Sequence, residues 1–212
     1  MEPSVKGGRR AQKALATRRC ILDAAEALFV RDGYAATTIA AIAMQADVAV
    51  QTVYAVFATK RAILAELLAV RTVGDDNTAH LKDRADWRAM ESEADPGRQL
   101  ALLAAIATRI GERMGALYTV LAGAADSDPE IAHLYQLQQL IRHEDQQRVA
   151  RSLAQKGALR PGLSPDRATD IMWAIANPTM HQRLVTERQW PPGDYEQWLA
   201  HILTCSLLNP GA

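Results

Sequence analysis

The sequence predicts an all-α protein, and three observations lead to that fold class. No proline occurs between Pro3 and Pro96, so long uninterrupted helices are permitted in the first half of the chain. Apolar residues recur at helical spacing along almost the whole sequence. The one stretch with strand-like composition, residues 48–57, has no second strand to pair with, and a lone strand leaves its backbone groups unpaired. We therefore expect this stretch to be helical too.

The first predicted helix runs from Leu15 to Phe29. Its apolar residues Ile21, Ala25 and Leu28 recur at helical spacing, and Gly33 follows as a C-terminal cap. Threonine hydroxyls are expected to cap the next helices, because a hydroxyl oxygen can accept from a free amide of the first turn. These are Thr37 and Thr38, ahead of a short helix to about Ala46, and Thr59, ahead of a long helix from Lys60.

The rest of the chain is predicted to be helical by its apolar pattern. Proline and small polar residues mark the helix starts, and we expect Asp128-Pro129, Ser164-Pro165 and Asn177-Pro178 each to begin a helix. The charged segment 75–95 is expected to be a long loop or a frayed helix end. The expected apolar faces are Leu103, Ala107, Ile110 and Met114; Ile131, Leu134, Leu137 and Ile141; Ala168, Ile171, Met172 and Ile175; and Tyr195, Trp198, Leu199 and Ile202.

The composition excludes several classes of protein. A chain of 212 residues, 49% hydrophobic and 23% charged, is long enough for a real core and too balanced for a disordered protein. No apolar run approaches the roughly 20 residues needed to cross a bilayer, and the start lacks an apolar signal core. We therefore expect a cytoplasmic protein with no membrane partner. The two cysteines, Cys20 and Cys205, are too few for a disulfide framework or a zinc site.

The net charge of zero conceals an uneven distribution. Residues 1–71 carry 10 basic and 6 acidic residues, a net charge of +4, and the remaining residues carry a net charge of −4. A basic N-terminal part favours a polyanion such as DNA as partner, because neutralising phosphates releases condensed counterions. Residues 1–16 are expected to form a flexible basic arm, which either enters a minor groove of DNA or serves as a solubilising tail.

The segment from Thr38 to Phe57 has the layout of a helix-turn-helix. Ala43 is small enough for a close approach of two helices, and Ile42 and Val53, with Val48, are placed to form a miniature core. Asp47 falls in the sharp turn, where a left-handed backbone is usual and aspartate is tolerated better than most residues. A second helix presented in this way fits the major groove, which is about 12 Å wide.

The stretch from Thr17 to Leu67 resembles the N-terminal domain of the TetR family of transcriptional regulators. The resemblance is carried by these residues in order: Ala27-Leu28-Phe29, Gly33-Tyr34, Thr37-Thr38, Ile42-Ala43, Thr52-Val53-Tyr54, Phe57, Thr59-Lys60 and Leu64. It implies an N-terminal three-helix DNA-binding domain at residues 17–62 and a helical ligand-binding and dimerisation domain at residues 63–212. The usual turn glycine and capping serine of the family are replaced here by Asp47 and Ala49.

Carried over to this sequence, the resemblance assigns Thr38, Tyr54 and Lys60 to contacts with DNA phosphates. It assigns Gln51 and Thr52 to base edges, since glutamine can bind adenine through two hydrogen bonds. The apolar side chains of Val50 and Ala55 are suited to thymine methyl groups. For Tyr54 the alternative is a packing role inside the domain. The operator sequence itself is not predicted.

The resemblance further implies a homodimer on a near-palindromic double-stranded DNA operator, released by a small, mostly apolar effector. Repression is the usual outcome in that family. Trp198, Leu199 and Ile202 are candidates for the dimer interface or for internal core. The candidate ligand-binding residues are Met114, Tyr118, Gln138, Asp145, Arg148 and Trp173, with Met180 as a further cavity candidate. For these the alternatives are plain core packing and, for Asp145 with Arg148, an ion pair at the surface.

Two other classes of function are weighed against this one. Glu130 and His133 have the Glu-x-x-His spacing of di-iron helical bundles, but no second such pair occurs in the sequence. We therefore expect no enzyme, no metal and no cofactor. An all-helical interaction protein is the remaining alternative, and the clustered basic residues argue against it.

Overall fold

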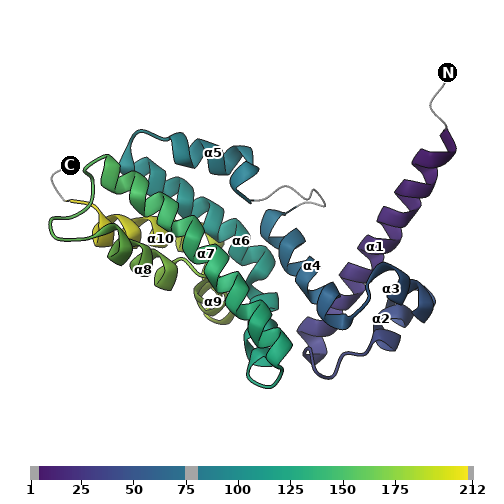
Figure 1. Cartoon of the computed structure of the whole chain (residues 1–212). Coiled ribbons are helices and arrows are strands. Elements are labelled where there is room, and N and C mark those ends of the chain that lie inside the picture. The colour runs from purple at the N-terminus through teal and green to yellow at the C-terminus, as the bar shows by residue number, and fades with distance from the viewer. Residues whose placement is uncertain (1–4, 75–80, 210–212) are drawn as a thin grey trace. The chain divides into compact units, whose positions relative to one another are not determined.

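The computed structural model describes residues 5–74 and 81–209, with side chains described from residue 12 onward. The described residues are helical, and their only strand-like pairing is an isolated bridge between Leu159 and Leu208, so the expected all-α fold class is confirmed. The helices, labelled in Figure 1, are α1 Val5–Asp32, α2 Ile39–Gln45, α3 Val50–Val56, α4 Lys60–Val73, η1 Leu81–Asp83, α5 Ala85–Ser92, α6 Pro96–Ala125, α7 Pro129–Gln155, α8 Pro165–Ile175, α9 Pro178–His181, η2 Gln182–Glu187 and α10 Pro192–Leu207.

The chain forms two compact units. Unit 1 comprises Met1–Ala69 and Val120–Ala132, and unit 2 comprises Val70–Thr119 and His133–Ala212. Three helices, α4, α6 and α7, each contribute residues to both units. Unit 1 therefore includes the α6–α7 turn. The domain boundary expected at residue 62 would place this turn in the C-terminal domain.

The helix caps and most of the core residues of unit 1 are those that the sequence predicted. Gly33 ends α1 with a left-handed backbone at φ +84°. The hydroxyl oxygen of Thr38 accepts from the amide of Ala41 at 3.1 Å and so caps α2, and Thr59 caps α4 in the same way. The buried core of this unit is made by all of α1 to α4: Ile21, Leu22, Ala25, Leu28, Phe29, Ile42, Val53, Phe57, Ile63, Leu64 and Leu67.

The expectation of a flexible arm at residues 1–16 is wrong for the part that the structure describes. The first helix begins at Val5, ten residues ahead of the predicted start at Leu15. Residues 9–16 consist of arginine, lysine, glutamine, alanine and leucine, which are strong helix formers, so extending an existing helix through them costs little. Residues 1–4 lie outside the described part.

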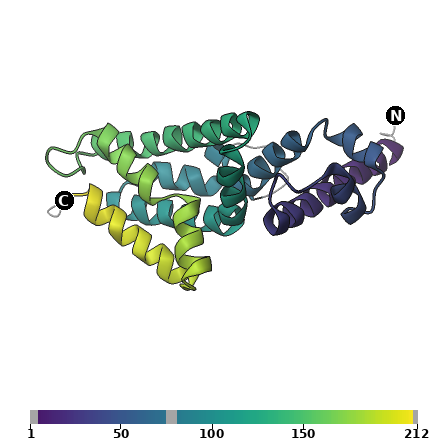
Figure 2. The same cartoon turned by 90° about the horizontal axis from the view of Figure 1, so that it is seen from below.

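Unit 2 packs its helices around one apolar core. Its members come from α5, α6, α7, α8 and α10 and include Trp87, Leu100, Leu153 and Tyr195. In both views α8 lies beside α10 (Figures 1 and 2). Leu199 of α10 is fully buried in this core, so of its two predicted roles the structure supports internal packing.

The predicted helix starts in unit 2 are confirmed, and one predicted loop is wrong. Ser164 caps α8 and Asn177 caps α9, each with a proline in the first turn. The segment expected as a loop from residue 75 to 95 instead contains η1 and α5, because Trp87 and Met90 give a short helix a buried face. Residues 75–80 lie outside the described part.

The apolar face predicted on α7 changes character along the helix. Ile131 and Leu134 are buried, whereas Leu137 and Ile141 are 44% and 45% exposed. Sequence spacing gives the face but not where the neighbouring helices stop covering it.

No single helix among the described residues is long and apolar enough to cross a membrane. Only α2 and α3 taken together reach that length and composition, and the two are bent by 104° relative to each other.

Candidate functional site

Two short helices in unit 1, α2 and α3, form the helix-turn-helix that the sequence predicted. Their 104° bend lies in the range typical of this motif. Ile42 and Val53 are fully buried between them, and Ala43 is 1% exposed, as expected at a close approach of two helices. Val48, the other expected core residue, is only half-buried.

The turn between the two helices is a Schellman motif. The amide of Val48 donates to the carbonyl of Ala43 at 3.0 Å, and the amide of Asp47 donates to the carbonyl of Met44 at 3.3 Å. Asp47 has φ +52°, so the predicted left-handed backbone is confirmed, with aspartate in the place where glycine is most common. The first turn of α3 has no side-chain cap, because Ala49 has no polar atom to offer.

The outer side of α3 presents most of the residues assigned to base contacts. Gln51 and Ala55 are exposed, Tyr54 is 54% exposed, and Val50 and Thr52 are half-buried. Val53 and Phe57 point the other way, into the core of unit 1. An internal packing role for Tyr54 is therefore wrong. Thr38 is exposed as well, and since its oxygen only accepts in the cap, its hydroxyl hydrogen is left to donate.

Lys60 has a role in the structure that the sequence did not indicate. Its ammonium donates to the carbonyls of Tyr34 at 2.7 Å and Thr37 at 2.8 Å, with a longer contact to Ala35 at 3.4 Å, and it lies 4.3 Å from the centre of the Tyr34 ring. Burial lowers the pKa of Lys60. The side chain thus fastens the loop between α1 and α2 to the start of α4, beside the capped end of α2.

Two further side chains of unit 1 were missed by the sequence reasoning. Arg18 of α1 pairs with Glu66 of α4 at 2.6 Å and lies over the ring of Phe57 at 4.6 Å. Burial, together with the charges of Asp128 and Glu130, raises the pKa of Tyr34 to about 12. The signal for Arg18 was only its place among the basic residues of α1, which also suits a contact with DNA.

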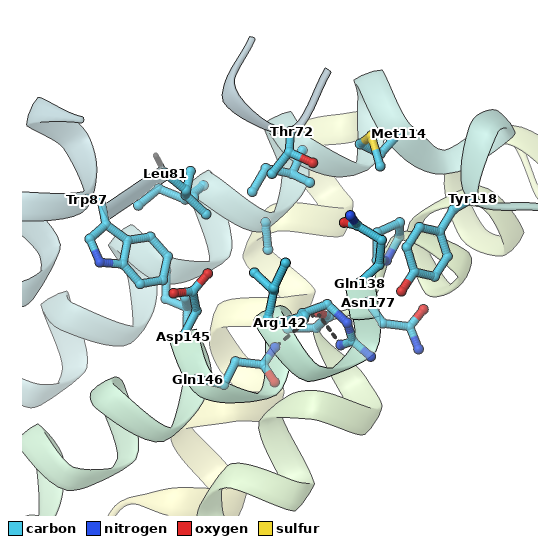
Figure 3. A pocket seen from close by; sticks show the side chains of 17 residues that line it. Thr72, Leu81, Trp87, Met114, Tyr118, Gln138, Arg142, Asp145, Gln146 and Asn177 are labelled. Carbon is cyan, nitrogen blue, oxygen red and sulfur yellow. Dashed lines mark hydrogen bonds between the residues drawn. The ribbon is translucent and has the colours of Figure 1, made fainter. Parts of the chain in front are cut away.

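A pocket in unit 2, of about 720 Å³ including space open to solvent, brings together four of the predicted ligand-binding residues: Met114, Tyr118, Gln138 and Asp145 (Figure 3). Its lining comes from α4, η1, α5, α6, α7, the α8–α9 turn and the first residue of α9. The sequence reasoning missed the other lining residues: Thr72, Leu81, Trp87, Leu103, Ile106, Ala107, Ile110, Ile141, Arg142, Gln146, Ala176, Asn177 and Pro178.

Three predicted cavity residues lie elsewhere. Arg148 is absent from the pocket lining and half exposed, and its ion pair is with Glu91 at 3.9 Å and not with Asp145 as the alternative expected. Trp173 is outside the lining, with its ring under the guanidinium of Arg142 at 4.9 Å. Met180 packs against the core of unit 2. Spacing along α7, α8 and α9 places these side chains near the apolar faces of their helices but does not show which of them line the pocket.

The pocket is notable for polar atoms that are buried without a partner. Among the described residues these include the indole nitrogen of Trp87, the hydroxyl of Tyr118, Nε of Arg142 and Oε1 of Gln146. A buried polar atom left unpaired in this way costs free energy, and most buried polar atoms in proteins are paired. Burial is also the main reason why the pKa of Asp145 is raised to about 6.

No group of three or more metal-ligating side chains able to hold a metal ion occurs in the part of the chain that the structure describes. Of the Glu-x-x-His pair considered above, Glu130 is 3.2 Å from Arg61, which gives this carboxylate a partner, and His133 is exposed.

Residues 21–67 match the family model described as "Bacterial regulatory proteins, tetR family". The match covers α1 from Ile21, all of α2 and α3, and the start of α4. A comparison of the whole sequence with curated proteins finds no significant match.

Solved structures with the same fold extend the likeness over nearly the whole chain. The SmeT–triclosan complex has a TM-score of 0.71 at 20% identity, covering 92% of this chain and 93% of that one. NalD, the secondary repressor of the MexAB-OprM multidrug efflux pump in Pseudomonas aeruginosa, has a TM-score of 0.70 at 21% identity, covering 94% and 99%. FadR from Bacillus subtilis in complex with stearoyl-CoA has a TM-score of 0.69 at 18% identity, covering 88% and 97%.

Proposed function

Residues 21–67 match the model of the TetR family of bacterial regulatory proteins, and we propose that the chain is a member of this family, a transcriptional repressor released from its operator by a small molecule. Its α3 helix enters the major groove of double-stranded DNA, and two copies of the chain bind a near-palindromic site together. The effector occupies the pocket of unit 2.

The outer face of α3 is the observation that carries this proposal. Gln51, Tyr54 and Ala55 project from it, while Val53 and Phe57 hold the helix to the core from the other side. Base edges in the major groove are read by a rigid helix whose exposed polar side chains lie along one side. A packing helix would instead bury Tyr54.

A dimer follows from the size of this face. Helix α3 has 7 residues and offers few side chains to the bases, so one copy discriminates weakly between sequences. Two copies of a helix-turn-helix read half-sites about 34 to 36 Å apart, one turn of the DNA helix. Trp198 and Ile202 of α10 are only partly covered within the chain and remain our candidates for the contact between copies.

Helix α4 supports a link between the effector and DNA binding. Its first residue, Lys60, holds the loop ahead of α2, and near its other end Thr72 lines the pocket. Arg113 of α6 donates to the carbonyls of Arg71 and Thr72 at 2.8 and 3.1 Å, which ties the last turn of α4 to the helix that carries Met114 and Tyr118. A ligand that moves this turn therefore acts on the helix that anchors the α1–α2 loop.

Known structures of the same fold support a small-molecule effector. SmeT and FadR were solved with triclosan and with stearoyl-CoA, respectively, and NalD is a repressor. We propose an effector that is mostly apolar here too, because most of the residues that line the pocket are apolar.

The test is binding of the purified protein to the DNA upstream of its own gene, measured by fluorescence anisotropy at several salt concentrations. Affinity is expected to fall steeply as salt rises, because phosphate contacts release counterions. If the protein does not bind this DNA at low salt, or if its affinity does not depend on salt, the proposal is contradicted and an interaction protein is favoured.

Matched variants separate readout from positioning. Gln51→Ala is expected to relax discrimination at particular base pairs, with a loss of about 1 to 3 kcal/mol on the preferred operator. Tyr54→Phe, which keeps the ring and removes only the hydroxyl, is expected to weaken binding to all sequences alike. Gln155→Ala, at an exposed position at the end of α7, is the control and should change neither.

A further inference from the structure

The pocket contains two side chains of opposite charge, and they differ in how far the protein already neutralises them. Arg142 and Asp145 both come from α7 and both line the pocket. Among the described residues neither has an ion pair. The chemistry of the effector depends on which of the two still needs a partner.

The charge of Arg142 is already partly balanced by the end of a helix. Its guanidinium donates to the carbonyls of Trp173 and Ala176, and its Nη2 donates to Oε1 of Gln139 at 2.9 Å. Both carbonyls belong to the C-terminal end of α8, which carries partial negative charge. The Trp173 ring, 4.9 Å from the guanidinium, adds a cation–π contact. The guanidinium therefore has a structural role. Its Nε has no hydrogen-bond partner among the described residues, and Tyr118 is the lining residue whose charge acts most on it.

Asp145 has no comparable partner. Its carboxylate makes no hydrogen bond or ion pair with any residue that the structure describes. The charges that act on it are those of Arg148 and Glu144 on α7, Glu91 on α5 and Lys82 on η1, two basic against two acidic groups. Arg148 is near Glu91, which reduces what it offers to Asp145. The pocket therefore holds one carboxylate whose charge the protein does not balance.

The surroundings of Asp145 suit an organic group. Figure 3 shows its carboxylate at the end of the pocket occupied by Trp87 and Leu81, with Tyr118 and Gln138 at the other end. Most of the other lining side chains are apolar, with Ile106 and Ile110 among them. An indole ring near a cation stabilises it further.

We infer that the effector is an organic cation with an apolar body, whose protonated nitrogen binds the Asp145 carboxylate at the Trp87 end of the pocket. The inference rests on the proposed function in one respect only, since it assigns the pocket to the effector. An ammonium supplies the missing counter-charge, and the apolar body replaces water along the aliphatic wall.

The test uses three probes of matched shape and different charge: 4-phenylbutylamine, 4-phenyl-1-butanol and 4-phenylbutyrate. Binding to the purified full-length protein is measured without DNA by isothermal titration calorimetry. The amine is expected to bind about tenfold or more tightly than the alcohol, the range given by one charge-assisted hydrogen bond in a partly buried site. Preference for the carboxylate, or equal binding of all three, overturns the inference.

Two variants assign the effect to one carboxylate. Asp145→Asn keeps the shape and removes the charge, and should bring the amine and the alcohol to within about twofold of each other. Glu144→Gln removes an equal charge from the next residue, which is exposed and does not line the pocket, and should leave the preference intact. An unchanged preference in Asp145→Asn, with circular dichroism showing it folded, contradicts the assignment.

A pH series gives a second readout. Because burial raises the pKa of Asp145 to about 6, affinity for the amine should fall as the pH drops below that value, while affinity for the alcohol should not. The same fall in Asp145→Asn overturns the assignment. Since these measurements contain no DNA, amine binding without operator binding would refute the proposed repressor and keep this inference, and the reverse result would do the opposite.

Discussion

The outer face of α3 and the pocket of unit 2 differ in how their polar groups meet water. The face of α3 is convex, and its polar groups are exposed to water until DNA replaces it. The pocket is concave, and it keeps Trp87, Tyr118 and Gln146 almost fully buried with polar atoms unpaired. Substitutions on the first should alter binding and leave folding intact. Substitutions around the second should alter both, because its walls are also the core of unit 2.

The largest expected effect contrasts two aromatic residues of unit 1. Phe29 is fully buried and Tyr54 is 54% exposed. Phe29→Ala should lower the free energy of unfolding by about 3 to 5 kcal/mol, because it removes a buried ring and leaves a cavity. Tyr54→Ala should change it by less than about 0.5 kcal/mol while weakening DNA binding. Urea denaturation followed by circular dichroism measures the free energy of unfolding of both variants. A similar decrease in the two variants would contradict the expected difference between the buried and the exposed ring.

The next effect comes from a close approach in unit 2. A Cβ added at Gly111 of α6 would overlap the ring of His181, which is buried and edge-on to Tyr195. Gly111→Ala should destabilise the protein by about 1 to 3 kcal/mol through overpacking. Adding His181→Ala should recover part of that loss in a double-mutant cycle.

Gly123→Ala, on the same helix, is the control. Nothing lies within 4 Å of its added Cβ, so the change should be neutral or slightly stabilising. A penalty at Gly123 as large as that at Gly111 would show that contact with His181 is not the cause of the loss at Gly111.

The helix-turn-helix and the pocket of unit 2 also differ in how well the sequence predicts them. The helix-turn-helix lies within Thr38 to Phe57, so its caps, the left-handed Asp47 and the buried Val53 follow from local spacing. The pocket is assembled from several elements far apart in the chain. Periodicity identified Met114, Tyr118, Gln138 and Asp145 as facing inward, but it gave no signal for Trp87 on a segment expected to be a loop.

Lys60 shows the limit of position-by-position reasoning within the predictable region. Its place at the start of α4 was foreseen, but its bonds to the carbonyls of Tyr34 and Thr37 depend on how the α1–α2 loop folds back. A family role as phosphate contact and a structural role as loop anchor predict different consequences of its removal.

Lys60→Met tests the anchor. Keeping the aliphatic stem and removing the ammonium leaves two carbonyls unpaired, and should cost about 1 kcal/mol of stability in addition to weakening DNA binding. Arg61→Met, which removes an exposed cation and its ion pair with Glu130, should cost less, since surface ion pairs contribute little. Equal stability of the wild type and Lys60→Met, together with reduced DNA affinity, would favour the phosphate role alone.

The smallest effect compares the two units at matched backbone positions. Asp47 in unit 1 and Gln189 in unit 2 are the non-glycine residues with positive φ in the described part of the chain, at +52° and +58°. Glycine adopts this conformation without strain, so Asp47→Gly and Gln189→Gly should each raise the thermal midpoint, by the equivalent of about 0.5 kcal/mol. Only Asp47→Gly should also tighten DNA binding at low salt, because it removes a negative charge next to the helix that meets the phosphates. If both variants tighten DNA binding, the cause is their higher stability and not the loss of charge. The charge of Asp47 would then have no effect on DNA binding.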